Sequence, residues 1–193
     1  MHSRSSDPLD AALTEATSRI RADIIALAAS NPVVIIDGRS GAGKSSLAGR
    51  LTREWPLRTP VQLVALDSLY PGWEGLERGA EIARETILVP HGRGRLGIWR
   101  RWDWEYGEPA EAHAVDPALG LILEGCGALT PASAALADVT VWVDGPHASR
   151  QARALERDGD GFRAKWNMWA AQEEAHMARH SPEALARISV RTP

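Results

Sequence analysis

Short apolar runs alternate with longer amphipathic stretches along most of this chain. The runs have the length and composition of strands buried on both faces, and they lie at residues 33–36, 61–66, 119–123, 139–143 and, more weakly, 187–191. Parallel strands need crossover connections, usually helices, and these helices cover both faces of the sheet. The alternation therefore predicts an α/β fold with a five-stranded, mostly parallel sheet and helices on both faces.

Two amphipathic segments flank the first apolar run. Apolar residues recur at helix-like spacing from Leu9 to Leu27, which predicts a lead-in helix that packs beside the sheet and ends before Pro32. A second helix is expected from Lys44 to about Trp55, because Pro56 then stops it.

The first run leads directly into a glycine-rich loop with the pattern GxxxxGKS. Gly38, Gly41 and Gly43 allow backbone conformations that turn successive N–H groups inward on a polyphosphate. Lys44 would reach the outer phosphates, and the Ser45 hydroxyl would ligate Mg²⁺. The alternative is a glycine turn without a ligand. The residues expected to contact a nucleotide are Gly38, Arg39, Ser40, Gly41, Ala42, Gly43, Lys44, Ser45 and Ser46.

Length and composition limit the other possibilities. A chain of 193 residues fits one domain, covering residues 1–193, and the net charge of −3 gives no electrostatic footprint for nucleic acid. Cys126 is the only cysteine, so no intramolecular disulfide can form. No apolar stretch approaches the roughly 20 residues that span a bilayer. A cytoplasmic protein with neither a membrane nor a nucleic-acid partner is expected.

Two carboxylates follow predicted strands at the edge where the glycine loop lies. Asp67 ends the run at 61–66 and is a candidate base that accepts a hydroxyl proton; the alternative is that it caps a turn. Glu124 ends the run at 119–123 and is a candidate Mg²⁺ ligand; the alternative is a structural carboxylate.

Residues 71–117 differ in kind from the rest of the chain. Glycine, arginine and tryptophan are frequent there, which predicts a long, loop-rich insertion with a function on the substrate side. The mixture suits stacking on a ring or anionic substrate, and a satellite core under a long loop is the equal alternative. The tryptophans expected to line an acceptor site are Trp73, Trp99, Trp102 and Trp104.

Three arginines follow the fourth strand at helical spacing. Arg150, Arg153 and Arg157 share one face of the expected helix, and glycines follow at 159 and 161. This pattern predicts a short lid over residues 147–163 whose arginines stabilise a transferring phosphoryl group. The alternative is a solvated face on which these arginines pair with neighbouring acidic residues.

Taken together, these motifs resemble the uridine kinase and phosphoribulokinase branch of the P-loop kinases. The resemblance rests on the glycine loop at 37–48, on LDSLYPGW at 66–73, on RRWDW at 100–104 and on LILEG at 121–125. The arginines of residues 147–163 match the branch's R-x-x-R-R-x-x-R-D pattern except at Ala154.

The resemblance implies a P-loop three-layer sandwich with strand order 2-3-1-4-5 and a short lid. It also implies an ATP-dependent kinase in which Asp67 is the base, Ser45 and Glu124 bind Mg²⁺, and the lid arginines contact the phosphates. The expected binding partner is a small-molecule acceptor. The oligomeric state considered is a homodimer. The residues predicted as catalytic are Asp67, Lys44, Arg153 and Arg157, and those predicted to contact the acceptor are Asp67, Tyr70, Trp73, Arg101 and Asp103.

The acceptor itself stays open at the level of sequence. The leading hypothesis is phosphorylation of a hydroxyl on a small polar metabolite, including a nucleoside. The alternatives are a kinase for nucleoside monophosphates or drugs, and a nucleotide-binding regulatory ATPase. A GTPase switch is disfavoured because the third strand ends in LEG rather than DxxG, and because no NKxD motif is present.

Overall fold

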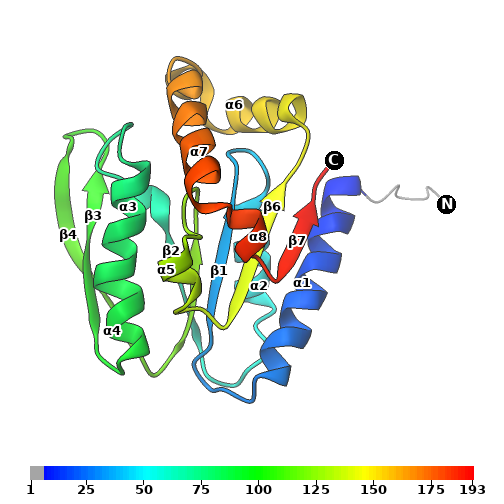
Figure 1. The fold of residues 1–193 in the computed structure, drawn as a ribbon, viewed down its shortest axis with the longest axis vertical. Coiled ribbons are helices and arrows are strands. Elements are labelled where there is room, and N and C mark those ends of the chain that lie inside the picture. The colour runs from blue at the N-terminus through cyan, green and yellow to red at the C-terminus, as the bar shows by residue number, and fades with distance from the viewer. Residues whose placement is uncertain (1–6) are drawn as a thin grey trace.

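The computed structural model describes residues 7–193, without the side chain of Asp160. Its centre is a five-stranded sheet in which all neighbouring strands are parallel (Figure 1). In spatial order the strands are β2 (Val61–Ala65), β5 (Gly120–Glu124), β1 (Val33–Gly38), β6 (Val139–Asp144) and β7 (Ile188–Arg191). This is the predicted order 2-3-1-4-5, so the expected fold class is confirmed.

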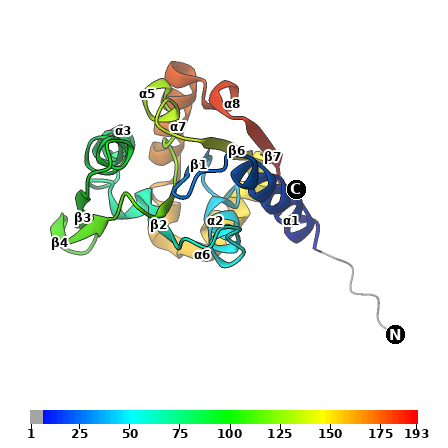
Figure 2. The ribbon, with the colours of Figure 1, turned by 90° about the horizontal axis from the view of Figure 1, so that it is seen from below.

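Helices cover both faces of this sheet and complete three layers (Figure 2). Val34 and Ile36 pack with α1 (Pro8–Ala26) and α2 (Lys44–Arg53) on one face. Val33 and Ile35 face the opposite way, because successive side chains of a strand alternate. The helices of this second face are α3 (Leu76–Ala83), α5 (Pro131–Ala134) and α7 (Trp166–His180).

The insertion at residues 71–117 has regular structure, so the expectation of a loop-rich segment is wrong. After α3 the helix continues through a π-helical turn, η2 (Arg84–Leu88), into α4 (Val89–Gly92). An antiparallel hairpin follows, formed by β3 (Gly97–Asp103) and β4 (Glu108–Val115). β4 is largely exposed and reads EPAEAHAV, so its local sequence carries little strand signal and its conformation depends on pairing with β3.

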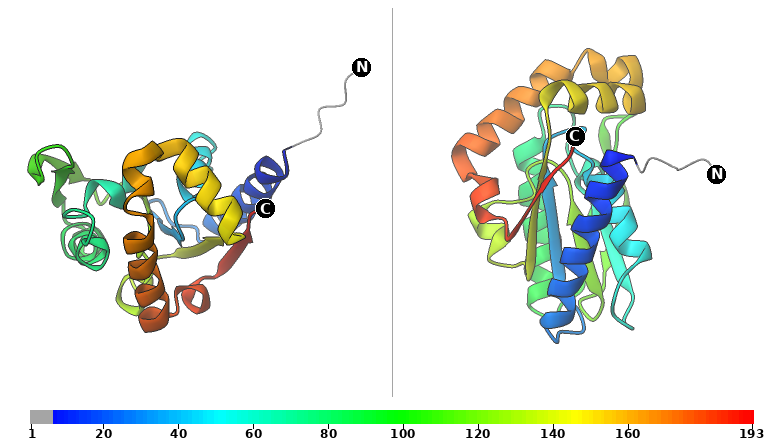
Figure 3. Two further views of the ribbon diagram at one scale, coloured as in Figure 1. Left: turned by 90° about the horizontal axis from the view of Figure 1, so that it is seen from above. Right: turned by 90° about the vertical axis from the view of Figure 1, so that its right-hand side faces the viewer.

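The carboxyl ends of the strands are covered by α6 (His147–Arg163), which lies across the top of the sheet (Figure 3). This helix is interrupted at Gly159, where φ is 68° and ψ is −155°. After the interruption the chain turns into α7, and it ends through the short helix α8 (Pro182–Leu185) and β7. In the described part of the chain no helix is both long and apolar enough to cross a membrane.

The end of β1 is fixed by the buried carboxylate of Asp37, which is 1% exposed. One of its oxygens accepts the backbone N–H of Gly127 at 2.9 Å, and the other accepts that of Leu129 at 2.8 Å. The second oxygen also lies 3.1 Å from Nε2 of His176 on α7. Asp37 therefore connects the start of the glycine loop both to the segment after β5 and to α7.

A second buried carboxylate, Glu173 on α7, holds the glycine loop itself. It accepts the backbone N–H of Ser40 at 2.7 Å and forms an ion pair with Arg39 at 3.2 Å. The same arginine reaches Glu174 at 2.6 Å, but the Glu174 side chain is 61% exposed whereas that of Glu173 is 4% exposed.

These contacts predict that Glu173→Gln destabilises the protein by about 1–2 kcal/mol, because the new amide places N–H donors against the Arg39 guanidinium in a buried site. Chemical denaturation at pH 7 measures the change. Glu174→Gln removes the exposed partner of the same arginine and should cost no more than about 0.5 kcal/mol. Equal losses in the two variants would contradict the role given to Glu173.

Candidate active site

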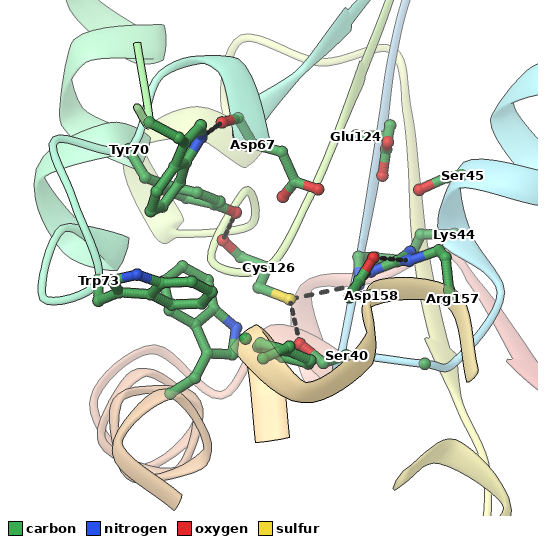
Figure 4. A pocket seen from close by; sticks show the side chains of 15 residues that line it. Ser40, Lys44, Ser45, Asp67, Tyr70, Trp73, Glu124, Cys126, Arg157 and Asp158 are labelled. Atoms are coloured by element: carbon green, nitrogen blue, oxygen red, sulfur yellow. Dashed lines mark hydrogen bonds and ion pairs between the residues drawn. The ribbon is translucent and has the colours of Figure 1, made fainter. Parts of the chain in front are cut away.

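A pocket of about 290 Å³ opens at the carboxyl ends of the strands (Figure 4). Its lining comes from the glycine loop, from η1 (Leu66–Ser68) and the segment after it, from the end of β5 and from the two helices α6 and α7. One lining residue, Trp104, comes from the turn of the β3–β4 hairpin. The lining residues are Ser40, Gly41, Lys44, Ser45, Asp67, Tyr70, Trp73, Trp104, Glu124, Cys126, Arg157, Asp158, Gly161, Phe162 and Trp169.

The glycine loop has the conformation that its sequence predicts. Gly41 has a φ of +75°, and a Cβ atom there would lie 2.0 Å from the carbonyl oxygen of Arg150. Gly43, with a φ of +104°, precedes the first residue of α2, and no side chain caps this helix end. The first N–H groups of α2 therefore face the loop, as expected for an anion-binding helix terminus.

Of the nine residues expected to contact a nucleotide, the structure places Ser40, Gly41, Lys44 and Ser45 in the pocket lining. The Arg39 side chain turns away to Glu173. The other members of the set supply backbone or lie beside this lining: Gly38, Ala42, Gly43 and Ser46.

Lys44 is buried within the loop, where its Nζ donates to the carbonyl of Arg39 at 3.1 Å and to Sγ of Cys126 at 3.3 Å. Burial by itself would lower the pKa of Lys44. The acidic groups around it, including Glu124 and Glu173, outweigh burial and raise the pKa above its usual value. Lys44 therefore carries a positive charge at neutral pH, which suits a contact with phosphates.

Glu124 is 5% exposed at the end of β5, and its carboxylate faces the Ser45 hydroxyl (Figure 4). Burial raises the pKa of Glu124 despite the opposing charge of Lys44, so the ionised form lacks full compensation. A buried carboxylate and a hydroxyl oxygen fit Mg²⁺, which prefers oxygen ligands. No group of three or more His, Cys, Asp or Glu side chains suited to holding a metal ion is found among the described residues.

Asp67 lies opposite, in η1 directly after β2. It is exposed to the pocket, and its carboxylate points towards Glu124 and Ser45 (Figure 4). No side chain caps η1, so the alternative of Asp67 as a cap for this helix finds no support. Its backbone carbonyl accepts the indole N–H of Trp104 at 2.9 Å, and no side chain in the described part of the protein bonds to its carboxylate.

Five aromatic side chains form the wall next to Asp67. Trp73 is at their centre, with its ring 5.1 Å from that of Trp104, 5.7 Å from that of Phe162 and 6.3 Å from that of Trp169. Tyr70 packs edge-on against Trp169 at 4.9 Å. Trp73 and Trp104 thus line this pocket, whereas the contribution of Phe162 from α6 was not foreseen.

The other two tryptophans of the insertion do not reach this pocket. Trp99 stacks on His113 of the paired strand, with ring centroids 4.7 Å apart, and packs against the apolar core. Trp102 is half-buried in β3, outside the lining. The prediction that all four tryptophans line one site is therefore wrong for these two, because strand alternation and the bulge between Arg100 and Trp102 direct them elsewhere.

Arg101 and Asp103, predicted to contact the acceptor, also lie outside the lining. Arg101 forms ion pairs with Glu111 at 2.7 Å and with Asp103 at 3.2 Å. Asp103 accepts the backbone N–H of Tyr106 at 3.1 Å and so shapes the hairpin turn. These contacts stabilise the β3–β4 hairpin. The positions of Arg101 and Asp103 give no support to a contact with substrate.

Two of the three lid arginines contact the backbone of the glycine loop from outside the pocket. Arg150, 2% exposed, donates to the carbonyl of Ser40 at 3.1 Å and pairs with Asp144. Arg153 donates to the carbonyl of Gly41 at 2.8 Å and also to the chain end at Pro193. Both guanidinium groups thus contact carbonyl oxygens, so the catalytic role predicted for Arg153 is not supported by its position.

Arg157 is the one lid arginine in the pocket lining. It forms an ion pair with Asp158 at 2.6 Å, as the alternative of a solvated face anticipated. The interruption of α6 at Gly159 follows directly, where the sequence predicted a flexible turn. Arg157 therefore lines the pocket next to the interruption of α6 while its guanidinium is paired with Asp158.

Cys126 is a pocket residue that sequence reasoning passed over. Its thiol lies 3.5 Å from the Ser40 hydroxyl and 3.4 Å from a Glu173 oxygen. Burial raises its pKa to about 12, so the thiol is neutral at physiological pH. The only available signal was its position two residues after Glu124.

The raised pKa of Glu124 predicts a pH-dependent effect of Glu124→Gln. Because the folded state binds this proton more tightly than the unfolded state, Glu124 costs stability once the pH rises above its ordinary pKa of 4.5. Without Mg²⁺ the variant should have a higher Tm than the wild type at pH 7, and the difference should shrink below pH 4.5. Glu108→Gln, at an exposed site on β4, is the control and should change Tm little at either pH.

Comparison with known proteins yields relatives by structure and none by sequence. No family model matches the chain, and no curated protein resembles it significantly in sequence. A possible uridine kinase from Bacillus stearothermophilus superposes with a TM-score of 0.67 at 17% identity, over 92% of this chain and 98% of that one.

Two further structures are similar over most of their length. A protein provisionally named as a fructose transport system kinase, from Silicibacter sp. TM1040, has a TM-score of 0.55 at 18% identity, over 90% of this chain and 98% of that one. The YGR205w protein has a TM-score of 0.50 at 13% identity, over 93% and 86% of the two chains. At such identities the similarity concerns the fold alone, and this chain shares the α/β fold of these structures.

Proposed function

We propose that this protein is an ATP-dependent phosphotransferase that moves the γ-phosphoryl group to a hydroxyl of a small molecule. The observation that carries the proposal is the placement of Asp67 in the same pocket as the glycine loop, with its carboxylate directed at Glu124 and Ser45. A phosphate-binding loop alone would also suit an ATPase. A carboxylate opposite it, free of side-chain partners among the described residues, is what transfer to an alcohol requires in addition.

In this reaction the acceptor hydroxyl lies between Asp67 and the terminal phosphate of ATP. The hydroxyl oxygen forms a bond to the γ-phosphorus while the bond to the β–γ bridging oxygen breaks and ADP leaves. The hydroxyl proton passes to the Asp67 carboxylate. Lys44 stabilises negative charge on the outer phosphate oxygens, and Arg157 contributes a second positive charge once it is released from Asp158.

Ser45 and Glu124 would hold the Mg²⁺ that accompanies ATP. The ion supplies charge neutralisation on the phosphates. Glu124 suits this role because its buried carboxylate lacks full compensation in the protein alone.

Two of the structural relatives are named as kinases: one as a possible uridine kinase, and the other provisionally as a fructose transport system kinase. Uridine and fructose both offer hydroxyl groups, which supports an alcohol as the acceptor here. A nucleoside acceptor is the finer hypothesis that the uridine kinase resemblance suggests.

The first test measures ADP release from Mg-ATP with and without a panel of nucleosides, sugars, nucleoside monophosphates and other alcohols. We expect release to depend on an added alcohol, and we expect Lys44→Ala to lower kcat/KM by at least about a hundredfold, since it removes several kcal/mol of transition-state stabilisation. ADP release that is independent of every acceptor would instead indicate a regulatory ATPase.

A second test separates the two carboxylates. Asp67→Asn should reduce kcat by about a hundredfold or more while leaving affinity for Mg-ATP near normal, because it removes only the proton acceptor. Glu124→Gln should raise the Mg²⁺ concentration needed for half-maximal activity by about tenfold. Steady-state kinetics over Mg²⁺ titrations measure both. If the two effects are exchanged between the variants, the roles are wrongly assigned.

A further inference from the structure

The pocket has two chemically different sides. The charged side carries Lys44, Ser45 and Glu124, and the Arg157–Asp158 pair stands at its edge (Figure 4). The opposite side, called here the aromatic wall, consists of the rings of Tyr70, Trp73, Trp104, Phe162 and Trp169. Asp67 lies next to this wall and faces the charged side, so an acceptor hydroxyl at Asp67 places the rest of the acceptor against the rings.

The polar atoms of the aromatic wall are largely engaged within the protein. The Tyr70 hydroxyl donates to the carbonyl of Cys126 at 2.7 Å, and the Trp104 indole N–H donates to the carbonyl of Asp67 at 2.9 Å. Behind the wall, the amide of Gln172 binds the backbone carbonyl of Trp73 at 2.7 Å. Among the described side chains of the wall, the groups left for a ligand are the indole N–H groups of Trp73 and Trp169 and the oxygen of the Tyr70 hydroxyl, which can still accept a hydrogen bond.

The wall is also preformed. Trp73, from the segment after η1, contacts Phe162 of α6, Trp169 of α7 and Trp104 of the hairpin. Rings held by several neighbours lose little further freedom when a ligand stacks on them. Trp104 is nevertheless 42% exposed, so apolar ring surface remains for a ligand to cover.

These features discriminate between classes of alcohol. A sugar or nucleoside brings further hydroxyl groups, and a nucleobase brings a polar edge that binding sites normally match with hydrogen bonds. Each such group left unpaired against the rings weakens binding, because its hydrogen bonds to water are lost and not replaced. A flat apolar ring avoids this cost and gains from each favourable ring contact, beyond the burial of its area.

Building on the proposed phosphoryl transfer, we propose that the acceptor is an aromatic alcohol: a molecule with one reactive hydroxyl next to an apolar, ring-containing body. The hydroxyl binds at Asp67, and the ring stacks against Trp73 and Trp104. On this proposal free nucleosides and sugars are poor acceptors, in contrast to what the uridine kinase resemblance suggests.

The kinetic test compares 2-phenylethanol and 2-(1-naphthyl)ethanol with uridine, cytidine and fructose in the ADP-release assay. We expect kcat/KM for the naphthyl alcohol to exceed that for uridine by at least about tenfold, the scale on which an unpaired polar group discriminates between substrates. A kcat/KM for uridine or fructose equal to or above that of both aromatic alcohols would overturn the proposal while leaving the kinase function intact.

A binding measurement tests the proposed aromatic site even if no acceptor is phosphorylated. Saturation-transfer NMR with 2-(1-naphthyl)ethanol measures Kd for the wild type, for Trp104→Leu and for the control Trp102→Leu, which changes a tryptophan of the same hairpin outside the pocket. We expect Trp104→Leu to weaken binding by about fivefold or more, the value of a ring contact plus its buried area, and Trp102→Leu to change it by less than about twofold. Thermal melts confirm that both variants fold.

Failure of the proposed kinase function and failure of the proposed aromatic site give different results. Absence of acceptor-dependent ADP release for every alcohol, with naphthyl binding that Trp104→Leu weakens, would overturn the kinase function and support the aromatic site. Absence of naphthyl binding to the wild type, equal weakening by both variants, or tighter binding of uridine than of the naphthyl alcohol would overturn the aromatic site.

Discussion

The burial of a few charged side chains against the backbone of the glycine loop is the constraint on which the rest of this structure depends. The loop has almost no side chains with which to make a core of its own, so its conformation must be fixed from outside. Asp37 and Glu173 accept backbone N–H groups at its start, and Arg150 and Arg153 donate to its carbonyl groups. Buried charged groups of this kind are tolerated only when they are hydrogen-bonded, and here the bonds fix the loop.

This arrangement separates the groups that support the loop from those that face the pocket. Arg150 and Arg153 belong to the supporting set, although their helical spacing with Arg157 suggests one shared role. The first two contact the loop from behind, and only Arg157 reaches the pocket. The same helix therefore both holds the phosphate-binding loop and covers the site. A movement of the residues of α6 after Gly159 would change the pocket lining at Phe162. It would leave the contacts of Arg150 and Arg153 with the glycine loop in place.

The charged side of the pocket includes one group that is unfavourable for the protein alone. Glu124 is buried with its pKa raised, so its charge lacks full compensation. Lys44 is also buried, but the acidic groups around it stabilise its charge and raise its pKa. The aromatic wall has the opposite character, since its rings pack on one another and its polar atoms are largely engaged. Charge complementarity thus governs the phosphate side, and shape and apolar area govern the other.

Sequence alone determined the strands of the sheet and the glycine loop expected to bind phosphate, whereas the strand order was implied by the resemblance to a known kinase branch. The strands and the loop are local features: a buried strand, a glycine turn and the helix after it are encoded in consecutive residues, and Asp67 and Glu124 follow their strands directly. The hairpin β3–β4 was not predictable, because β4 is exposed and gains its conformation from its partner strand. The roles of Glu173, Phe162 and the lid arginines likewise depended on where α6 and α7 pack.

Tertiary structure alone decided which side chains meet. Trp73 and Trp104 reach the pocket while Trp99 and Trp102 do not, although all four belong to one tryptophan-rich segment. The physical reason is that the direction of a side chain depends on strand register, on a bulge and on the angle at which one helix crosses a sheet. None of these is a property of neighbouring residues in the chain. Composition therefore left a substrate site and a satellite core equally open, and only packing decided between them for each tryptophan.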